Sequence, residues 1–232
     1  MSSARSLNLA PDKLLRLQQL ASPVLPVGAY SYSEGLEMLV ETGTIDAAPA
    51  LQYWLEQELA IGSLVTDGAM LCRAYTAVNA NDVDQLKYWN SWWSAARETQ
   101  ELRNQGWQMG RSLVRLLKSL DDSVQPWLDA LVPQANWPIV FGVAVAHWEI
   151  DLQAALLAYF QGWAANAIGA GVKLIPLGQT VGQQLLMDLT PAITTASEQA
   201  MGMSDVDLSS CSWGLALASS QHEMQQVRLF QS

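Results

Sequence analysis

Apolar residues recur along most of this chain at intervals of three and four, the spacing of one face of an α-helix. The clearest stretch is 98–118, where five apolar or small residues follow spacings of four, three, four and three: Leu102, Gly106, Met109, Leu113 and Leu116. No window alternates with period two over any length. The pattern therefore predicts one all-α domain, a bundle of about nine or ten helices covering residues 1–232. We expect 1–10 and 225–232 to be flexible tails.

Proline, glycine and acidic residues mark where the other helices begin and end. The expected segments are 12–20, a helix from Ser31 to before Gly43, one from Asp46 to about Gly62, then 67–78, 82–96, 127–132, 138–148, 151–172, a helix through Gln183 that ends before Pro191, 192–201 and 211–224. Two glycines, Gly106 and Gly110, leave one side of 98–118 bare, so a neighbouring helix is expected to approach closely there.

The stretch 20–37, called the link below, interrupts this helical pattern. Pro23 and Pro26 lack amide donors and favour extended geometry in the residues before them. Ser31 and Glu34 then form an S-x-x-E capping box, which predicts that a helix restarts there. The apolar residues of the link either fill the core between two helices or form a stiff surface that a partner contacts.

Composition excludes some classes of binding partner. Half of the residues are hydrophobic, ten are tryptophan and the net charge is −10. Nucleic acid and anionic membrane both need clustered cations, so neither is an expected partner. Cys72 and Cys211 are far apart in sequence and form no C-x-x-C motif, which is typical of reduced thiols in a cytoplasmic protein. The N-terminus lacks the pattern of a signal peptide. The apolar stretch 154–172 contains Gln161 and Asn166, so we interpret it as a buried helix.

Few residues are candidates for catalysis or for binding a metal or cofactor. His147 is interpreted as a helix-terminal residue, and His222 as a ligand only if a metal were shared between chains. There is no Gly-Lys dipeptide for a phosphate loop and no G-x-S-x-G frame. We expect no catalytic residue, cofactor or metal site, hence no enzyme. The alternative is an all-α isoprenoid or lipid enzyme that holds magnesium through Asp82/Asp84 or Asp121/Asp122.

Cations gather in one helical stretch, where Arg111, Arg115 and Lys118 share a face. This face is either solvated or a docking stripe for an acidic partner. Lys173 is isolated among apolar residues, where it either extends to the surface or serves a site.

Three segments together resemble the UreF family. They are LLRLQQLASPVLPVGAYSYSEGLE at 14–37, VKLIPLGQTVGQQLL at 172–186 and HEMQQVRLFQS at 222–232. The resemblance implies an all-α, dimeric, cytoplasmic chaperone of urease maturation. It implies partners as well: a UreD-type protein (also called UreH), the GTPase UreG, and apo-urease. In such a complex the family member bridges the other two accessory proteins, and nickel reaches urease as GTP is hydrolysed.

The resemblance also assigns partner-binding positions, motif by motif. They are Pro23, Pro26, Gly28, Tyr30, Ser31, Gly35, Lys173, Pro176, Gly178, Gln179, His222, Glu223, Arg228, Leu229, Phe230 and Ser232. Tyr30 stands where the family often has Phe, and Gln231 where Arg is common. A generic helical scaffold unrelated to urease is the remaining alternative. We expect the tail, 227–232, to become ordered on a UreD-type partner, because Leu229 and Phe230 have too few neighbours in sequence to bury them.

Overall fold

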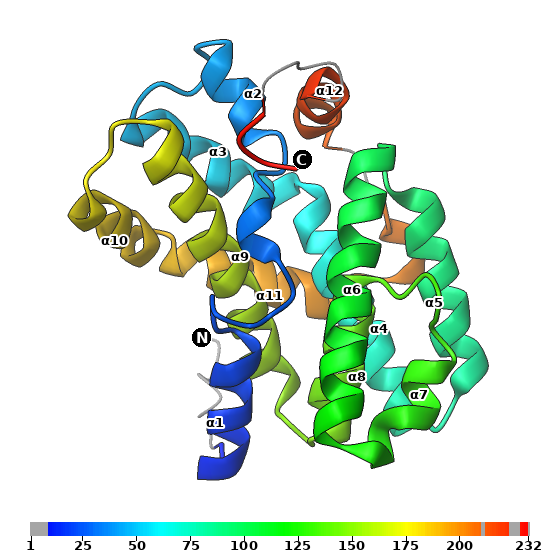
Figure 1. Cartoon of the computed structure of the whole chain (residues 1–232). Coiled ribbons are helices and arrows are strands. Elements are labelled where there is room, and N and C mark those ends of the chain that lie inside the picture. The colour runs from blue at the N-terminus through cyan, green and yellow to red at the C-terminus, as the bar shows by residue number, and fades with distance from the viewer. Residues whose placement is uncertain (1–8, 210–211, 223–227, 232) are drawn as a thin grey trace.

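The computed structural model describes residues 9–209, 212–222 and 228–231. At Trp213 it describes the backbone alone. Within these residues the protein has twelve α-helices, three short 3-10 helices and no strand (Figure 1). The predicted all-α class is confirmed. The predicted count of nine or ten helices is too low, although the predicted segments themselves include the regions of the two shortest helices, α2 and α7.

The helices follow the predicted segments with small shifts at their ends. Their bounds are α1 (Pro11–Leu20), η1 (Ala29–Ser31), α2 (Leu36–Glu41), α3 (Ala48–Ile61), α4 (Ser63–Asn79), α5 (Val83–Ala96), α6 (Gln100–Leu120), η2 (Asp122–Val124), α7 (Gln125–Asp129), α8 (Trp137–His147), α9 (Leu152–Leu174), α10 (Gln179–Asp188), α11 (Thr190–Gly202), η3 (Asp205–Asp207) and α12 (Trp213–His222).

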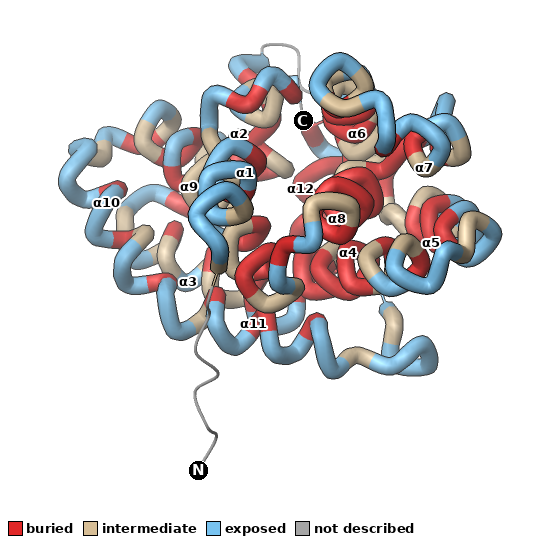
Figure 2. The backbone as a smooth tube through the Cα atoms, turned by 90° about the horizontal axis from the view of Figure 1, so that it is seen from below, coloured by how far each residue is buried: buried red, intermediate tan, exposed pale blue. Residues whose placement is uncertain are grey.

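Helices α4 and α8 form the centre of the molecule. Residues 138–146 of α8 are apolar on every side and all are buried, as expected for a helix enclosed by others. The two backbones approach closely at Gly142, where a Cβ atom would lie 2.6 Å from the carbonyl oxygen of Leu71. Figure 2 shows α4 and α8 buried at the centre, while α10, α3 and α5 turn exposed residues outward.

Helix α6 covers α8 from one side. Thr99 caps it, with its hydroxyl accepting a hydrogen bond from the amide of Leu102. A Cβ on Gly110 would lie 2.0 Å from the carbonyl oxygen of Ala135. The predicted close approach at this glycine is therefore confirmed, although its neighbour is the connection before α8 rather than a helix.

Helix α9 runs along the opposite side of the core and packs against α2, α4, α10 and α11. Its apolar face is buried through residues such as Leu156, Phe160 and Ile168. Among the residues that the structure describes, no helix is long and apolar enough to cross a bilayer. The interpretation of 154–172 as a packed helix is thus confirmed.

The link differs from its prediction. It turns at Ser22–Leu25, where the Leu25 amide donates to the Ser22 carbonyl, instead of running extended. The capping box is also wrong: α2 begins at Leu36, after Gly35, and has no side-chain cap. Glu34 has a φ of 53°, which turns its side chain inward to accept hydrogen bonds from α6 and α9. Contacts inside the protein have displaced the local capping motif.

Candidate functional site

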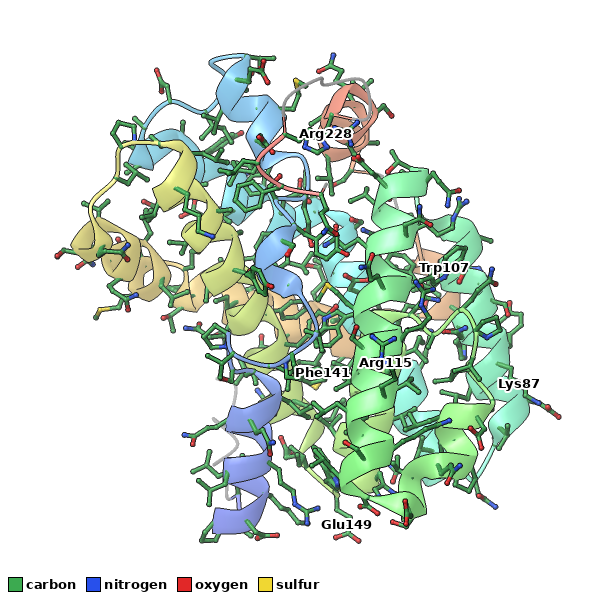
Figure 3. All side chains as sticks on the ribbon, in the orientation of Figure 1. Lys87, Trp107, Arg115, Phe141, Glu149 and Arg228 are labelled. Carbon is green, nitrogen blue, oxygen red and sulfur yellow. The ribbon has the colours of Figure 1, made fainter. Side chains whose placement is uncertain are left out.

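Part of each of the three segments that carry the family resemblance lies at one end of the molecule: Ser31 to Glu37, Lys173, and His222 with residues 228–231. The described part of the tail, residues 228–231, lies among the link, α2, α6, α9 and α12 (Figure 1). Figure 3 labels Arg228 at this end, beside α12. Three side chains from three helices hold the segment in place, and we call them the tail clamp: Glu37, Glu101 and His222.

Glu37 of α2 binds the tail backbone. Its two carboxylate oxygens accept the amides of Leu229, at 2.7 Å, and Phe230, at 2.9 Å. The side chain is buried, and a buried carboxylate is stable only when hydrogen-bond donors compensate for lost hydration. The tail amides are such donors, so Glu37 and the tail stabilise each other.

His222 joins the two carboxylates of the clamp. It is 0% exposed, its Nε2 lies 3.3 Å from Oε2 of Glu37, and its Nδ1 lies 3.2 Å from both oxygens of Glu101. The ring therefore fixes the distance between α2 and α6 at the end of α12. It serves as a structural bridge inside one chain, and the interpretation of a metal ligand shared between chains has no support in this geometry.

The tail side chains complete the contact. Arg228 pairs with Glu101 at 2.9 Å, and the amide of Gln231 donates to the carbonyl of Ser31. Phe230 is 6% exposed and Leu229 is 65% exposed. The Nζ atom of Lys173 lies 5.5 Å from the centre of the Phe230 ring, within cation–π range. The tail thus buries Phe230 inside the chain and presents Leu229 outward. The expected reason for ordering only on a partner, that neither residue can be buried within the chain, is therefore wrong for Phe230, because residues distant in sequence supply its contacts.

The structure brings together about half of the predicted partner-binding positions. Those at the tail are Ser31, Gly35, Lys173, His222, Arg228, Leu229 and Phe230. Gly35 has a φ of +79°, and a Cβ there would lie 3.1 Å from that of Ala218 in α12. Glycine is therefore required both by the backbone and by the packing of α12.

The other predicted positions lie apart from the clamp or outside the described residues. Pro23, Pro26 and Tyr30 are exposed on the link, and Gly28 takes the left-handed conformation before η1. Pro176, Gly178 and Gln179 are exposed where α9 leads into α10, at the left of Figure 1. Glu223 and Ser232 lie outside the described residues. The expected flexibility of 225–232 stays a prediction, as only 228–231 are described within it.

Sequence reasoning missed Glu37 and Glu101. Nothing near either residue in sequence needs a carboxylate, so neither is a candidate from local pattern. Charge could have indicated them. The tail contains an arginine and backbone amides that need acceptors if the tail is buried, and Glu37 is an acidic residue inside the first family segment. Periodicity alone does not reveal such a pairing, since 192 positions separate Glu37 from Leu229.

The remaining candidates have structural roles. Asp82 caps α5, and Asp121 caps η2 while lying 3.2 Å from Nε2 of His147, the last residue of α8. These acidic pairs are helix ends and do not face a common cleft for magnesium. Lys118 pairs with Asp129 of α7. Within the described part of the chain, no group of three or more His, Cys, Asp or Glu residues is arranged to hold a metal ion.

The fold and the site define a class of protein: an all-helical domain whose C-terminal segment is bound against its first turns and helices. The family assignment is consistent with this. The sequence model of the UreF family matches residues 45–190. The UreF urease accessory protein of Nostoc sp. is 56% identical over 224 residues, covering 97% of this chain and 98% of the relative. That of Trichormus variabilis is 52% identical, covering 98% of this chain and 99% of the relative. That of Hahella chejuensis is 37% identical, covering 97% of this chain and 100% of the relative. This chain belongs to the UreF family of urease accessory proteins.

Proposed function

We propose that this chain acts in the cytoplasm as a chaperone of urease maturation that bridges a UreD-type protein and the GTPase UreG. Nickel is the cargo of the resulting complex, and apo-urease receives it. The observation that carries the proposal is the convergence of parts of the three family segments on the tail clamp. Segments so far apart in sequence meet at one surface, and a shared binding surface accounts for their occurrence together.

The chemistry of this surface suits a protein partner. Leu229 and Tyr30 are 65% and 67% exposed, and Arg228, the residue before Leu229, pairs with Glu101. Exposed apolar residues next to an arginine are typical of the central part of a protein interface. We assign this surface to the UreD-type partner. The clamp holds the tail in a fixed shape, which lowers the entropy cost of binding.

We further propose that the chain forms a homodimer through helix–helix contacts. The high tryptophan content and the exposed apolar residues of several helices support this. Light scattering at micromolar concentration should give twice the monomer mass, alone or with partners. A monomer under both conditions would contradict the dimer.

Co-purification with UreD and UreG, with and without nickel and GTP, tests the bridging role. Deleting residues 223–232 should abolish capture of the UreD-type partner, while helical content and the dimer persist. Leu229→Asp should weaken capture at least tenfold, since it places a charge in an apolar contact. The matched control is Val206→Asp, at an exposed apolar residue of η3 distant in sequence from the tail. If the truncated chain captures its partner at full strength, the tail surface is not the docking site.

A further inference from the structure

A cavity of about 110 Å³ lies inside the protein behind the link. The link forms one wall through Ser22, Pro23 and Ala29, and helices α4, α5, α6, α8 and α9 form the others. A water molecule needs roughly 10–15 Å³ of such space. The cavity is therefore large enough for a small organic molecule.

Aromatic rings make up much of its wall. Trp93, Trp137, Phe141, Tyr159 and Trp163 all line it. Trp137 and Tyr159 both lie against Phe141, with ring centres 5.7 and 5.3 Å away. Figure 3 labels Phe141 in the middle of the molecule, between α9 and α6. Faces of aromatic rings carry negative potential and attract cations, most strongly where water is excluded.

Two carboxylates lie in the same wall. Glu34, turned inward by its positive φ, accepts hydrogen bonds from Nε2 of Gln105 and Nε1 of Trp163, both at 2.8 Å. Asp67 of α4 lies 3.3 Å from the hydroxyl of Tyr159, which donates to it. Burial raises the pKa of Asp67 to about 7. A carboxylate with so little hydration gains more from a bound cation than an exposed one does.

A third acceptor has no donor. Asn136 is 1% exposed, and its Oδ1 atom is buried without a hydrogen-bond partner within the described residues. Its amide orientation is fixed, because Nδ2 donates to the carbonyl of Asn90 and the hydroxyl of Ser94, each at 2.8 Å. Asn136 lines the cavity, but its Oδ1 atom is itself covered by its neighbours, and a Cβ on Gly106 would lie 3.6 Å from it. A buried acceptor without a donor adds to the unbalanced negative character of this wall.

The charges around the cavity also favour a cation. Arg97, which lies over the ring of Trp93, is the cation of the lining. Four carboxylates oppose this one cation. Glu34 and Asp67 lie in the wall, and Glu98 is close enough to raise the pKa of both Asp67 and Glu58. Oxygen Oε2 of Glu98 is likewise buried without a partner in the described part of the chain.

We propose that this cavity is a binding site for a small organic cation, a primary ammonium or amidinium ion. Its N–H groups bind the Asp67 carboxylate, and its carbon atoms pack on Trp137 and Phe141. This site is separate from the tail clamp and independent of the bridging role.

Calorimetric titration and saturation-transfer NMR on the full chain test the site with n-propylammonium chloride as the probe. Neutral n-propanol, of nearly equal size, is the control ligand. We expect saturable binding of the ammonium ion and at least tenfold weaker binding of the alcohol. Affinity should fall about tenfold from pH 8 to pH 6, because protonation of a carboxyl with a pKa near 7 removes the counter-charge.

Matched variants locate the binding. Gly162→Leu of α9 fills the cavity that Gly162 lines, whereas Gly169→Leu of the same helix enters open space. Gly162→Leu should abolish binding of the ammonium ion, and Gly169→Leu should preserve it. Asp67→Asn should weaken binding at least tenfold. Circular dichroism checks that each variant is folded. Three results would overturn the proposal: no binding of the ammonium ion, equal binding of propanol, or full binding by folded Gly162→Leu. A Ni²⁺ titration is run in parallel, and a response of Ni²⁺ alone, lost in the same variants, would replace the organic cation by a metal ion.

Discussion

Oxygen Oε2 of Glu37 lies 3.3 Å from Nε2 of His222 and also accepts the amide of Phe230. One carboxylate thus joins α2, the end of α12 and the tail. Because all three groups are buried, the loss of this charge leaves two backbone amides and a histidine without their acceptor.

Glu37→Gln should therefore release the tail. The variant keeps the size of the side chain but replaces one acceptor oxygen by a donor. We expect the free energy of unfolding to fall by about 1–3 kcal/mol in urea titrations. Hydrogen exchange of the C-terminal peptide should become faster. Asp84→Asn, at an exposed position of α5, is the control and should change neither quantity; unchanged exchange in Glu37→Gln would show that the tail is held by Phe230 alone.

Lys173→Ala removes the cation over the Phe230 ring. The contact is worth about 0.5–1 kcal/mol at an exposed site, so folding should persist with a small loss of stability. If Lys173 also serves docking or gating, urease activation reconstituted with UreD, UreG, nickel and GTP should fall severalfold. Lys87→Ala on α5 is the control. Activation at the wild-type level would limit Lys173 to packing on the tail.

Two glycines in long helices should respond oppositely to alanine. Gly110→Ala in α6 places a methyl group 2.0 Å from a carbonyl oxygen, and we expect it to destabilise the protein by about 3 kcal/mol or more. Gly169→Ala in α9 meets open space and should stabilise it by about 0.5–1 kcal/mol through helix propensity. Thermal unfolding measures both. Equal effects of the two substitutions would mean that α6 and the Ala135 segment separate readily.

Stability should decline as pH rises through the acidic range. Burial raises the pKa of Glu58 from 4.5 to about 7. Between these values the folded protein holds a proton that the unfolded chain has lost, so the free energy of unfolding falls with increasing pH and levels off above about 7. From pH 5 to pH 8 this group alone should cost about 2 kcal/mol.

Glu58→Gln isolates that contribution. The amide oxygen can still accept the hydrogen bond from Ser212, at 2.9 Å in the wild type, but has no charge to desolvate. Urea unfolding at pH 5 and pH 8 should therefore give a smaller difference for the variant, by about 2 kcal/mol. An identical difference for variant and wild type would mean that Glu58 is ionised in the folded protein at pH 5.

The fold was predictable to the extent that local patterns determine it. The expected segments 82–96 and 98–118 match α5 and α6 to within about two residues at each end, because the apolar faces of these helices are regular; the caps, Asp82 and Thr99, were not predicted. The link was predicted wrongly at Ser31 and Glu34. A capping motif has a local energy of about 1 kcal/mol, and the hydrogen bonds from Gln105 and Trp163 to Glu34 outweigh it.

The candidate site was predictable only in part. Family motifs identified Lys173, His222 and Phe230, but no local pattern links them to Glu37 or Glu101. The cavity was not predicted at all. Its wall combines residues from Leu20 to Asn166, most of them with an ordinary place on a helix face. Only their arrangement in space shows that two carboxylates and five rings surround one volume.

The long separation in sequence between Glu37 and the tail has a consequence for synthesis. Helix α2 emerges from the ribosome well before the residues that satisfy Glu37. Domains form from the N-terminus first, so this carboxylate and its apolar surroundings lack their partner while most of the other helices are being made. The surface around Glu37 is therefore finished late, when Leu229 and Phe230 reach it.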